Sequence, residues 1–227
     1  EVITSIINFG RGKDKYLVMV TKKGIIKKTN IKDFGIVRRS GLRAIKIEEG
    51  DELSFVKGAG DNGEILLASS SGNVIRFKER EIREMGRNAM GVRGMKITTG
   101  NKQQTTDNGI VGMEVIPTDI LNPDSSNSKV YLLTLGENGF GKRTDIQKFR
   151  LQRRGGKGII GMKVSPKTGN LAKAYLVKDE EDLIIISEKG QTIKTKIKTI
   201  PILGRISQGV KAIKVKKDDG VASAITI

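Results

Sequence analysis

The chain has 227 residues, with 42 Lys and Arg against 25 Asp and Glu, so its formal net charge is +17. The sequence contains no Cys and no His, which excludes disulfides, zinc sites built on these residues, a histidine general base and a Ser-His-Asp triad. The excess of positive charge indicates a polyanionic partner, most commonly nucleic acid, and aromatics at 4% are too few for a protein that stacks single-stranded bases.

An anionic membrane is the weaker candidate for this partner. No apolar run approaches the roughly 18 residues of a spanning helix, and no basic amphipathic helix of useful length is visible. We therefore predict no membrane association and no cofactor. The chain begins at Glu1 without a signal peptide, so we expect a piece of a longer cytoplasmic protein.

Four segments of the chain share one pattern, an apolar run followed by a turn with Gly and a basic strand. The segments are YLVMVTKKGIIKKT (16–29), ILLASSSGNVIRF (65–77), VYLLTLGENGFGKRT (130–144) and LIIISEKGQTIKT (183–195). Their turn glycines are Gly24, Gly72, Gly139 and Gly190. Gly at such a position adopts the left-handed backbone of a short hairpin loop without steric cost, so each segment predicts a β-hairpin.

A second element follows each hairpin. It reads SGLRAIKI (40–47), MGVRGMKI (90–97), KGIIGMKV (157–164) and QGVKAIKV (208–215), with leading glycines Gly41, Gly91, Gly158 and Gly209. These glycines lie 17, 19, 19 and 19 residues after the turn glycines, and 50, 67 and 51 residues from one another. The longer interval predicts an insertion of about 17 residues in the polar stretch 98–129, which we expect to be a surface loop around the apolar piece 110–116.

Each copy is expected to contain two hairpin strands, a third strand in the second element, and a fourth strand in the apolar pieces 53–56, 111–116 and 172–177. About 50 residues with four strands is typical of a propeller blade. No 3.6-residue period persists, and 82–85 could form one helical turn only. We predict an all-β, propeller-like disc of four-stranded blades, one domain over 1–227 with repeats 1–50, 51–100, 101–167 and 168–227.

Basic residues recur at fixed places in this repeat. Four residues after the turn glycines stand Lys28, Arg76, Arg143 and Lys194, and five after the leading glycines stand Lys46, Lys96, Lys163 and Lys214. The hairpin strands and the segments between them add Lys27, Lys78, Lys142, Lys196, Arg38, Arg39, Arg87, Arg93, Arg153, Arg154 and Arg205. Alternation along a strand places Lys194, Lys196 and Lys198 on one face. We predict that these residues form a basic stripe that binds duplex DNA through its phosphates. For any single Lys, the alternative is that it lies on a solvated strand edge and that its charge prevents aggregation there.

The third copy carries QRRGGKG, formed by Gln152, Arg153, Arg154, Gly155, Gly156, Lys157 and Gly158. This segment, with NVIRFKEREIREMGRNAMGVRGMKI (73–97), ENGFGKRTDI (137–146) and GRISQGVKAIKV (204–215), resembles the C-terminal domain of the A subunits of bacterial DNA gyrase and topoisomerase IV. The resemblance covers nearly the whole chain. Two consecutive Arg offer forked donors to phosphate, and the glycines permit close backbone approach; a tight, merely basic turn between blades is the alternative.

The resemblance implies a β-pinwheel that wraps duplex DNA around its rim and so enables ATP-dependent negative supercoiling by gyrase. The partners would be the B subunit together with the rest of the A subunit, in the bacterial cytoplasm at the nucleoid, with the catalytic Tyr and the ATPase outside this chain. Tyr16, Tyr131 and Tyr175 lie in apolar runs and are expected in the core. The family usually has five or six blades and places its decisive box near the first, whereas this chain shows four copies and its best box in the third.

Three other functions stay open at this stage. The corresponding domain of topoisomerase IV binds DNA without supercoiling it negatively, and the intact QRRGGKG favours gyrase over it. A propeller that scaffolds proteins would show little salt sensitivity in partner binding. An enzyme that uses the central channel of a propeller is disfavoured by the lack of His and of a clustered carboxylate pair.

Overall fold

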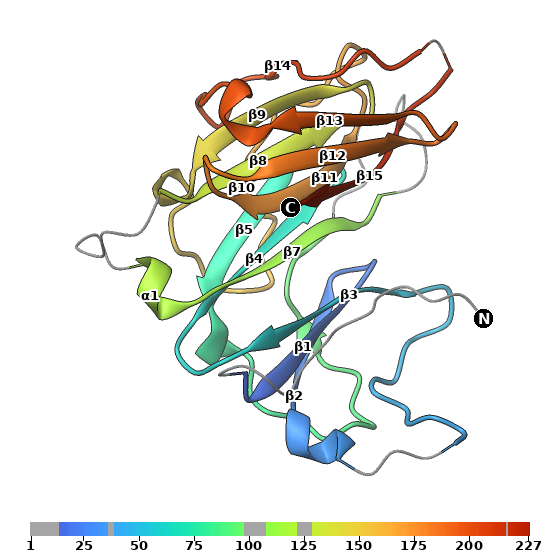
Figure 1. The fold of residues 1–227 in the computed structure, drawn as a ribbon. Helices are drawn as coiled ribbons and strands as arrows, with labels where there is room; N and C mark the ends of the chain where they lie inside the picture. The colour runs from blue at the N-terminus through green and yellow to red at the C-terminus, as the bar shows by residue number, and fades with distance from the viewer. Residues whose placement is uncertain (1–13, 36–38, 98–107, 122–128, 217) are drawn as a thin grey trace.

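The computed structural model describes residues 14–35, 39–97, 108–121, 129–216 and 218–227. Four antiparallel hairpins follow one another through the molecule, from the blue first hairpin to the orange fourth (Figure 1). They are β1 (Tyr16–Thr21) with β2 (Ile25–Asn30), β4 (Glu64–Ser69) with β5 (Asn73–Lys78), β8 (Tyr131–Gly136) with β9 (Phe140–Asp145), and β12 (Asp182–Ser187) with β13 (Thr192–Lys196). The predicted hairpins are therefore confirmed, and all four turn glycines have φ between +78° and +84°.

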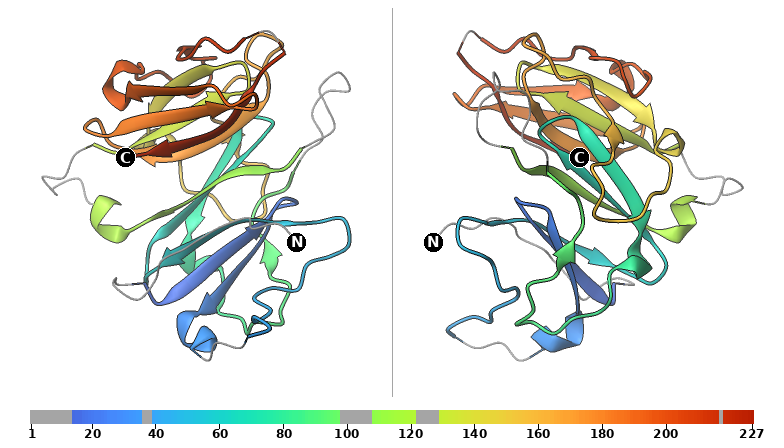
Figure 2. Two further views of the ribbon diagram at one scale, coloured as in Figure 1. Left: turned by 45° about the vertical axis from the view of Figure 1, so that its right-hand side comes forward. Right: turned by 180° about the vertical axis from the view of Figure 1, so that it is seen from behind.

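A third strand pairs with the first strand of each hairpin. These strands are β3 (Leu53–Ala59), β7 (Ile110–Ile116), β11 (Leu171–Val177) and β15 (Val221–Thr226). Three of them were predicted from the sequence and β15 was not. The strands β3, β7, β11 and β15 contact one another in that order, so they form the inner side of a propeller-like stack of blades (Figure 2).

The outermost strand of a blade comes from the following copy of the repeat. β6 (Val92–Arg93) pairs with β2, β10 (Ile159–Ile160) pairs with β5, and β14 (Val210–Lys211) pairs with β9. The expectation that this strand belongs to its own copy was therefore wrong. The leading glycine of the next copy lies against the preceding hairpin, where a Cβ on Gly158 would meet the Val74 carbonyl oxygen at 2.5 Å, so the absence of a side chain permits this close approach between residues far apart in the chain.

Strand exchange gives three four-stranded sheets, β3-β1-β2-β6, β7-β4-β5-β10 and β11-β8-β9-β14. We call them the first, second and third blades. In the part of the chain that the structure describes, the fourth blade has three strands, β15-β12-β13. The prediction of an all-β fold built from four blades is confirmed, and the fourth strand of the last blade is the exception.

Short helices connect the hairpins to the next element. The 3-10 helices are η1 (Ile31–Phe34), η2 (Glu79–Glu81), η3 (Ile146–Lys148) and η4 (Ile197–Thr199), and the one α-helix among the described residues is α1 (Thr118–Leu121). η2 ends just before the residues for which one helical turn was considered. None of the described helices is long and apolar enough to cross a membrane. Most of the predicted insertion, 98–107 and 122–128, lies outside the described residues, whereas its apolar piece forms β7.

Apolar side chains fill the space between consecutive blades. Val18 and Val20 of the first blade pack against Ile65 and Leu67 of the second, and all four are fully buried. Corresponding clusters lie between the second and third and between the third and fourth blades. Because the first hairpin strands of the first three blades are covered on both faces, their sequences read as nearly continuous apolar runs. Tyr131 is buried, and Tyr16 and Tyr175 are packed against these clusters, as expected.

Candidate nucleic-acid interface

The basic residues four positions after the turn glycines are buried in the first three blades. Lys28, Arg76 and Arg143 are at most 7% exposed. Lys28 Nζ lies 2.5 Å from Glu79 Oε1, Arg76 Nε lies 2.5 Å from Glu64 Oε2, and Arg143 pairs with Asp179. A buried charge needs such a partner because its desolvation is costly. Phosphate cannot reach these groups, so the prediction that they bind DNA is corrected here.

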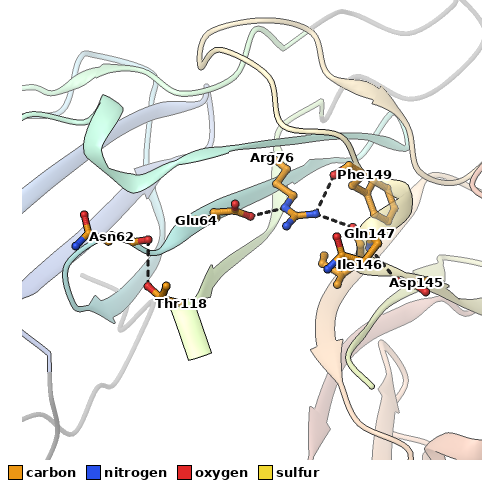
Figure 3. A network of polar contacts seen from close by, with 8 residues as sticks. All are labelled: Asn62, Glu64, Arg76, Thr118, Asp145, Ile146, Gln147 and Phe149. Carbon is orange, nitrogen blue, oxygen red and sulfur yellow. Dashed lines mark hydrogen bonds and ion pairs between the residues drawn. The ribbon is translucent and has the colours of Figure 1, made fainter. Parts of the chain in front are cut away.

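Arg76 shows what this position does instead (Figure 3). Its Nη1 donates to the carbonyl oxygens of Ile146 at 2.9 Å and Phe149 at 3.0 Å, in the turn that follows the next hairpin. Arg143 donates in the same way to the Ile200 and Lys198 carbonyl oxygens. The side chain therefore ties one blade to the next. Lys194 occupies this position in the fourth blade, is 58% exposed, and lies 2.8 Å from Asp182 Oδ2.

The two lysines three positions after a turn glycine are also internal. Lys27 and Lys142 are 0% exposed. Lys27 Nζ donates to the carbonyl oxygens of Ala44 at 2.7 Å and Arg87 at 2.6 Å. Lys142 Nζ donates to those of Gly204 and Arg205, at 2.6 Å each. Burial lowers the pKa of both lysines from 10.5 to about 8. They too are removed from the predicted DNA-binding set, because their ammonium groups have no access to solvent.

The remaining predicted basic residues are at the surface, apart from Arg38, which lies outside the described residues. Exposed side chains are those of Arg39, Lys46, Lys78, Arg93, Lys96, Arg153, Lys157, Lys163, Lys194, Lys196 and Lys214, and partly exposed ones are those of Arg87, Arg154 and Arg205. The alternation predicted for the last hairpin holds, since Lys194 and Lys196 are exposed while Ile197 is buried. Lys198 follows in η4 and is also exposed.

Three loops at equivalent places carry part of this charge. We call residues 84–91, 151–158 and 202–209 the box loops; each starts beside a buried hairpin residue, with Arg76 bridged to Leu151 and Arg143 to Ile202. The lysine five positions after a leading glycine donates its backbone N–H to the box loop of the next copy. These bonds are Lys46 to Ala89 O at 3.2 Å, Lys96 to Gly156 O at 2.8 Å, and Lys163 to Ser207 O at 3.2 Å.

This repeated bond places one exposed lysine beside each box loop. The bond joins Lys46 to the loop that carries Arg87, Lys96 to the loop that carries Arg153 and Lys157, and Lys163 to the loop that carries Arg205. Arg205 donates from Nη1 to the Ile160 carbonyl oxygen at 3.1 Å, and we call the remaining residues of this set the basic edge: Lys46, Arg87, Lys96, Arg153, Lys157 and Lys163. Each box loop belongs to the copy that follows the one carrying its lysine. The basic edge therefore extends from one blade to the next.

The residues of QRRGGKG have different roles within their loop. Arg153 and Lys157 point to solvent, whereas Arg154 is half-buried and donates to the Glu81 carbonyl oxygen at 3.0 Å through Nε. Gly155 has φ +83°, and its N–H donates to the Gly94 carbonyl oxygen at 2.6 Å. Gln152 is half-buried and its backbone N–H donates to the Arg76 carbonyl oxygen. The glycines shape the loop, and two of its three basic side chains are available to a ligand.

Sequence reasoning missed several exposed basic residues near this edge, among them Arg83 and Arg150 directly before two box loops, and two more at one position of the repeat. Lys211 in β14 and Arg43 in the first copy occupy the place of Arg93, two residues after a leading glycine. Aligning the four second elements on their glycines would have revealed them. The third copy has Ile160 there, 45% exposed. Among the described residues, no three His, Cys, Asp or Glu come together to hold a metal ion.

Fold and surface together define a class: a strand-exchanging, propeller-like β domain with a polycationic edge. The family model described as the DNA gyrase C-terminal domain, beta-propeller, matches residues 15–57, 63–102, 131–178 and 181–227. The chain belongs to this family.

Individual relatives agree with this assignment. The gyrase A protein of Ureaplasma parvum is 38% identical over 97% of this chain and 24% of its own length, and that of Pseudomonas aeruginosa is 39% identical over 90% and 20%. The chain thus spans about a quarter of the length of these relatives. Among solved structures, the C-terminal domain of DNA topoisomerase IV matches with a TM-score of 0.82 at 21% identity, covering 97% of this chain and 64% of that one. The DNA gyrase A C-terminal domain matches with 0.78 at 23%, covering 97% and 72%. At these identities the structures show the fold alone.

Proposed function

We propose that this chain, which is not catalytic by itself, is the DNA-binding and DNA-wrapping domain of a bacterial gyrase A protein. The observation that carries the proposal is the basic edge, where three copies of the repeat place a lysine beside a box loop through the same backbone bond. The repeating fold accounts for the backbone bond, and the feature that supports a partner is that the residue making it is an exposed Lys in all three copies. Duplex DNA fits such a row of charges, because its phosphates recur along the axis at about one charge per 1.7 Å.

The side chains of the basic edge suit phosphate and carry little sequence information. Arg153 offers a planar fork for two phosphate oxygens, and Lys157 and Lys96 add point charges. Phosphate contacts fix the position of a duplex without reading its bases, so binding would be largely independent of sequence. Any preference would follow the ease with which a given sequence bends.

Contacts on successive blades imply a curved DNA path. Bending 20–30 base pairs by 40–90° costs of order 1–6 kcal/mol, which contacts along the whole path must offset. Arg153 and Lys157 lie in the box loop of the third copy, between the other two box loops in chain order. Removing contacts from the path would let the duplex straighten while it stays bound elsewhere.

In the whole enzyme this domain would serve ATP-dependent negative supercoiling. The catalytic Tyr and the ATPase would lie outside the chain, in the remaining parts of the A and B subunits, which are the proposed protein partners. The place of action would be the bacterial cytoplasm at the nucleoid. The gyrase relatives and the intact QRRGGKG support gyrase over topoisomerase IV.

The bending of a duplex tests the proposal. A duplex of a few tens of base pairs carries dyes at both ends, and energy transfer is measured as the chain is added. We expect transfer to rise with the wild type, and to fall back for Arg153→Ala/Lys157→Ala while most of the affinity remains. A matched control, Lys129→Ala/Lys189→Ala, removes two exposed lysines outside the box loops and should leave bending unchanged.

One outcome would contradict the proposed wrapping, and another would contradict the role given to the box. If the wild type binds the duplex without any rise in transfer, the domain does not wrap DNA. If the box variant bends DNA normally, this copy of the box is a structural turn. A supercoiling assay on the parent holoenzyme then separates gyrase from topoisomerase IV, because only gyrase introduces negative supercoils.

A further inference from the structure

Two isoleucines interrupt the basic surface where the second blade meets the third. Ile160, in the outer strand β10 of the second blade, is 45% exposed. Ile206, in the box loop that lies on the third blade, is 62% exposed. A single exposed apolar side chain is common on protein surfaces and needs no explanation. These two belong to different copies of the repeat, and the fold brings them to one place.

Hydrogen bonds hold the segments of the two isoleucines together. Arg205 Nη1 donates to the carbonyl oxygen of Ile160 at 3.1 Å. The backbone N–H of Lys163 donates to the carbonyl oxygen of Ser207 at 3.2 Å. Arg205 and Ser207 directly precede and follow Ile206 in the chain. The box loop of the fourth copy therefore lies along the second element of the third copy. We call such a contact between consecutive copies a junction.

The preceding junction shows how close the two positions are. Gly155 and Arg93 stand there at the equivalent places. Arg154 makes the arginine bond of that junction, from Nη1 to the Arg93 carbonyl oxygen at 2.9 Å. A Cβ on Gly155 would lie 3.9 Å from the Cβ atom and 3.9 Å from the Cγ atom of Arg93. Side chains at these positions are neighbours, so Ile160 and Ile206 form one apolar patch, which we call the isoleucine pair.

Solvent exposure is a property of these two positions, and other junctions fill them with different residues. Arg43 and Asn88 occupy them at the first junction, and both are exposed, as is Arg93 at the second. Asn88 and Arg93 have copies of the repeat before and after them, so their exposure does not depend on their place along the chain. Of the three junctions in the residues that the structure describes, one has an apolar side chain at both positions.

Positive charge flanks the isoleucine pair. Lys157 precedes Ile160 by three residues and Lys163 follows it by three, and both lysines belong to the basic edge. Six residues of extended chain span up to about 20 Å, so the two lysines can reach phosphates on both sides of a DNA groove. An apolar centre between cations is complementary to a groove whose floor carries methyl groups between two rows of phosphates.

The width and chemistry of the grooves select the major one. It is about 12 Å wide and displays the C5-methyl group of thymine, whereas the minor groove is about 6 Å wide and displays polar acceptors and the guanine amino group. Two branched side chains on separate backbone segments fit the wider groove. An apolar contact with the methyl group is one of the ways in which proteins recognise thymine.

We propose that the isoleucine pair contacts thymine methyl groups in the major groove of the bound duplex and gives the interface a preference for A·T base pairs. The inference rests on the proposed function, because it needs a duplex that lies along the basic edge. Phosphate contacts carry no base information directly, so this preference comes from Ile160 and Ile206. They are the specificity-determining residues of a surface that otherwise tolerates any sequence.

Removal of the thymine methyl group alone tests this contact. Two duplexes of a few tens of base pairs share one A·T-rich sequence, and deoxyuridine replaces every thymine in one of them. Base pairing is kept and only the methyl groups are lost. The wild type should bind the thymine duplex about 5-fold more tightly, which is the lower end of the effect of one changed base pair in a protein–DNA complex. Ile160→Asn/Ile206→Asn should bind both duplexes equally.

Two further variants make the measurement specific. Ile225→Asn/Ile227→Asn is the matched control, because it removes two isoleucines that are 56% and 59% exposed in and directly after β15, and it should keep the preference. Ile160→Arg/Ile206→Asn gives the junction the residue types of the first junction. It should lose the preference yet bind more tightly at low salt, with a slope of log K against log salt concentration steeper by about 0.9.

Failure of this inference and failure of the proposed function give different results. A wild type that does not bind either duplex would overturn both. A wild type that binds and bends both duplexes equally would leave the proposed function intact and overturn the thymine contact, and the isoleucine pair would then be open to a protein partner. A preference that persists in Ile160→Asn/Ile206→Asn, or one that is also lost in the control at unchanged Tm, would show that the isoleucine pair is not its source.

Discussion

Arg154 donates a hydrogen bond from Nη1 to the carbonyl oxygen of Arg93 at 2.9 Å, across two neighbouring copies of the repeat. Arg205 makes the equivalent bond to Ile160 at 3.1 Å. The second arginine of QRRGGKG is therefore a positioning residue, which holds the box loop against the outer strand that the preceding copy supplies. Its neighbour Arg153 has an exposed side chain and is free to serve a ligand.

Arg154→Ala is expected to destabilise the fold more than Arg153→Ala does. The first change removes the bonds from Nε to Glu81 O and from Nη1 to Arg93 O, and should lower the free energy of unfolding by about 1–3 kcal/mol. The second should stay within about 0.5 kcal/mol. Urea denaturation followed by circular dichroism measures both. Equal effects would mean that the two arginines do not differ in role.

Arg76→Ala should destabilise the chain strongly, by about 3–5 kcal/mol, because it leaves Glu64 buried without its partner. Lys78→Ala, two residues further along the same strand, removes an exposed charge and should leave stability nearly unchanged. Thermal unfolding of both variants checks this. A mild effect at Arg76 would show that the link between the second and third blades is unimportant for stability.

Lys27 and Lys142 should make stability rise with pH above neutrality. Burial holds each folded-state pKa at about 8, whereas the unfolded value is 10.5, so between these limits the unfolded chain binds more protons. The free energy of unfolding then rises with pH from about 8 to 10.5, by up to about 3 kcal/mol per lysine.

The comparison with Lys27→Met/Lys142→Met isolates this contribution from other titrating groups. The variant should lose the rise. At pH 7 it relieves two buried charges and removes the lysine donor from four carbonyl oxygens, of which that of Gly204 still accepts from the N–H and the hydroxyl of Ser207. Denaturant unfolding at pH 7, 8, 9 and 10 gives the difference curve. Parallel curves for the two proteins would contradict the low pKa values.

Affinity for duplex DNA should fall steeply with salt, and single residues of the basic edge should contribute measurably to the slope. Each phosphate contact contributes about −0.9 to the slope of log K against log salt concentration. Lys96→Ala/Lys163→Ala should therefore make the slope shallower by about 1.8. Fluorescence anisotropy between 50 and 200 mM salt measures it, with Lys129→Ala/Lys189→Ala as control. An unchanged slope would place the DNA path away from Lys96 and Lys163.

The repeat and most of the strands can be read from local patterns of residues. Apolar runs that end at Gly24, Gly72, Gly139 and Gly190 specify hairpins, because the turn needs a positive φ that Gly adopts without strain. The net charge and the regular placement of Lys and Arg indicated a polyanionic partner. The turns and strands depend on residues close together in the chain, and the net charge is a sum over residues. Both can therefore be predicted without knowing the tertiary structure.

The three-dimensional packing of the blades was needed to show which charges face solvent and which copy completes which blade. Lys142 and Lys163 look alike in the sequence, yet Lys142 is buried and donates to two backbone carbonyl oxygens, whereas Lys163 is exposed. A two-residue strand such as β10 carries no pairing information of its own, so its partner depends on the close approach of Gly158 to Val74. Pairing and burial follow from contacts between residues far apart in the chain, and local patterns do not encode them.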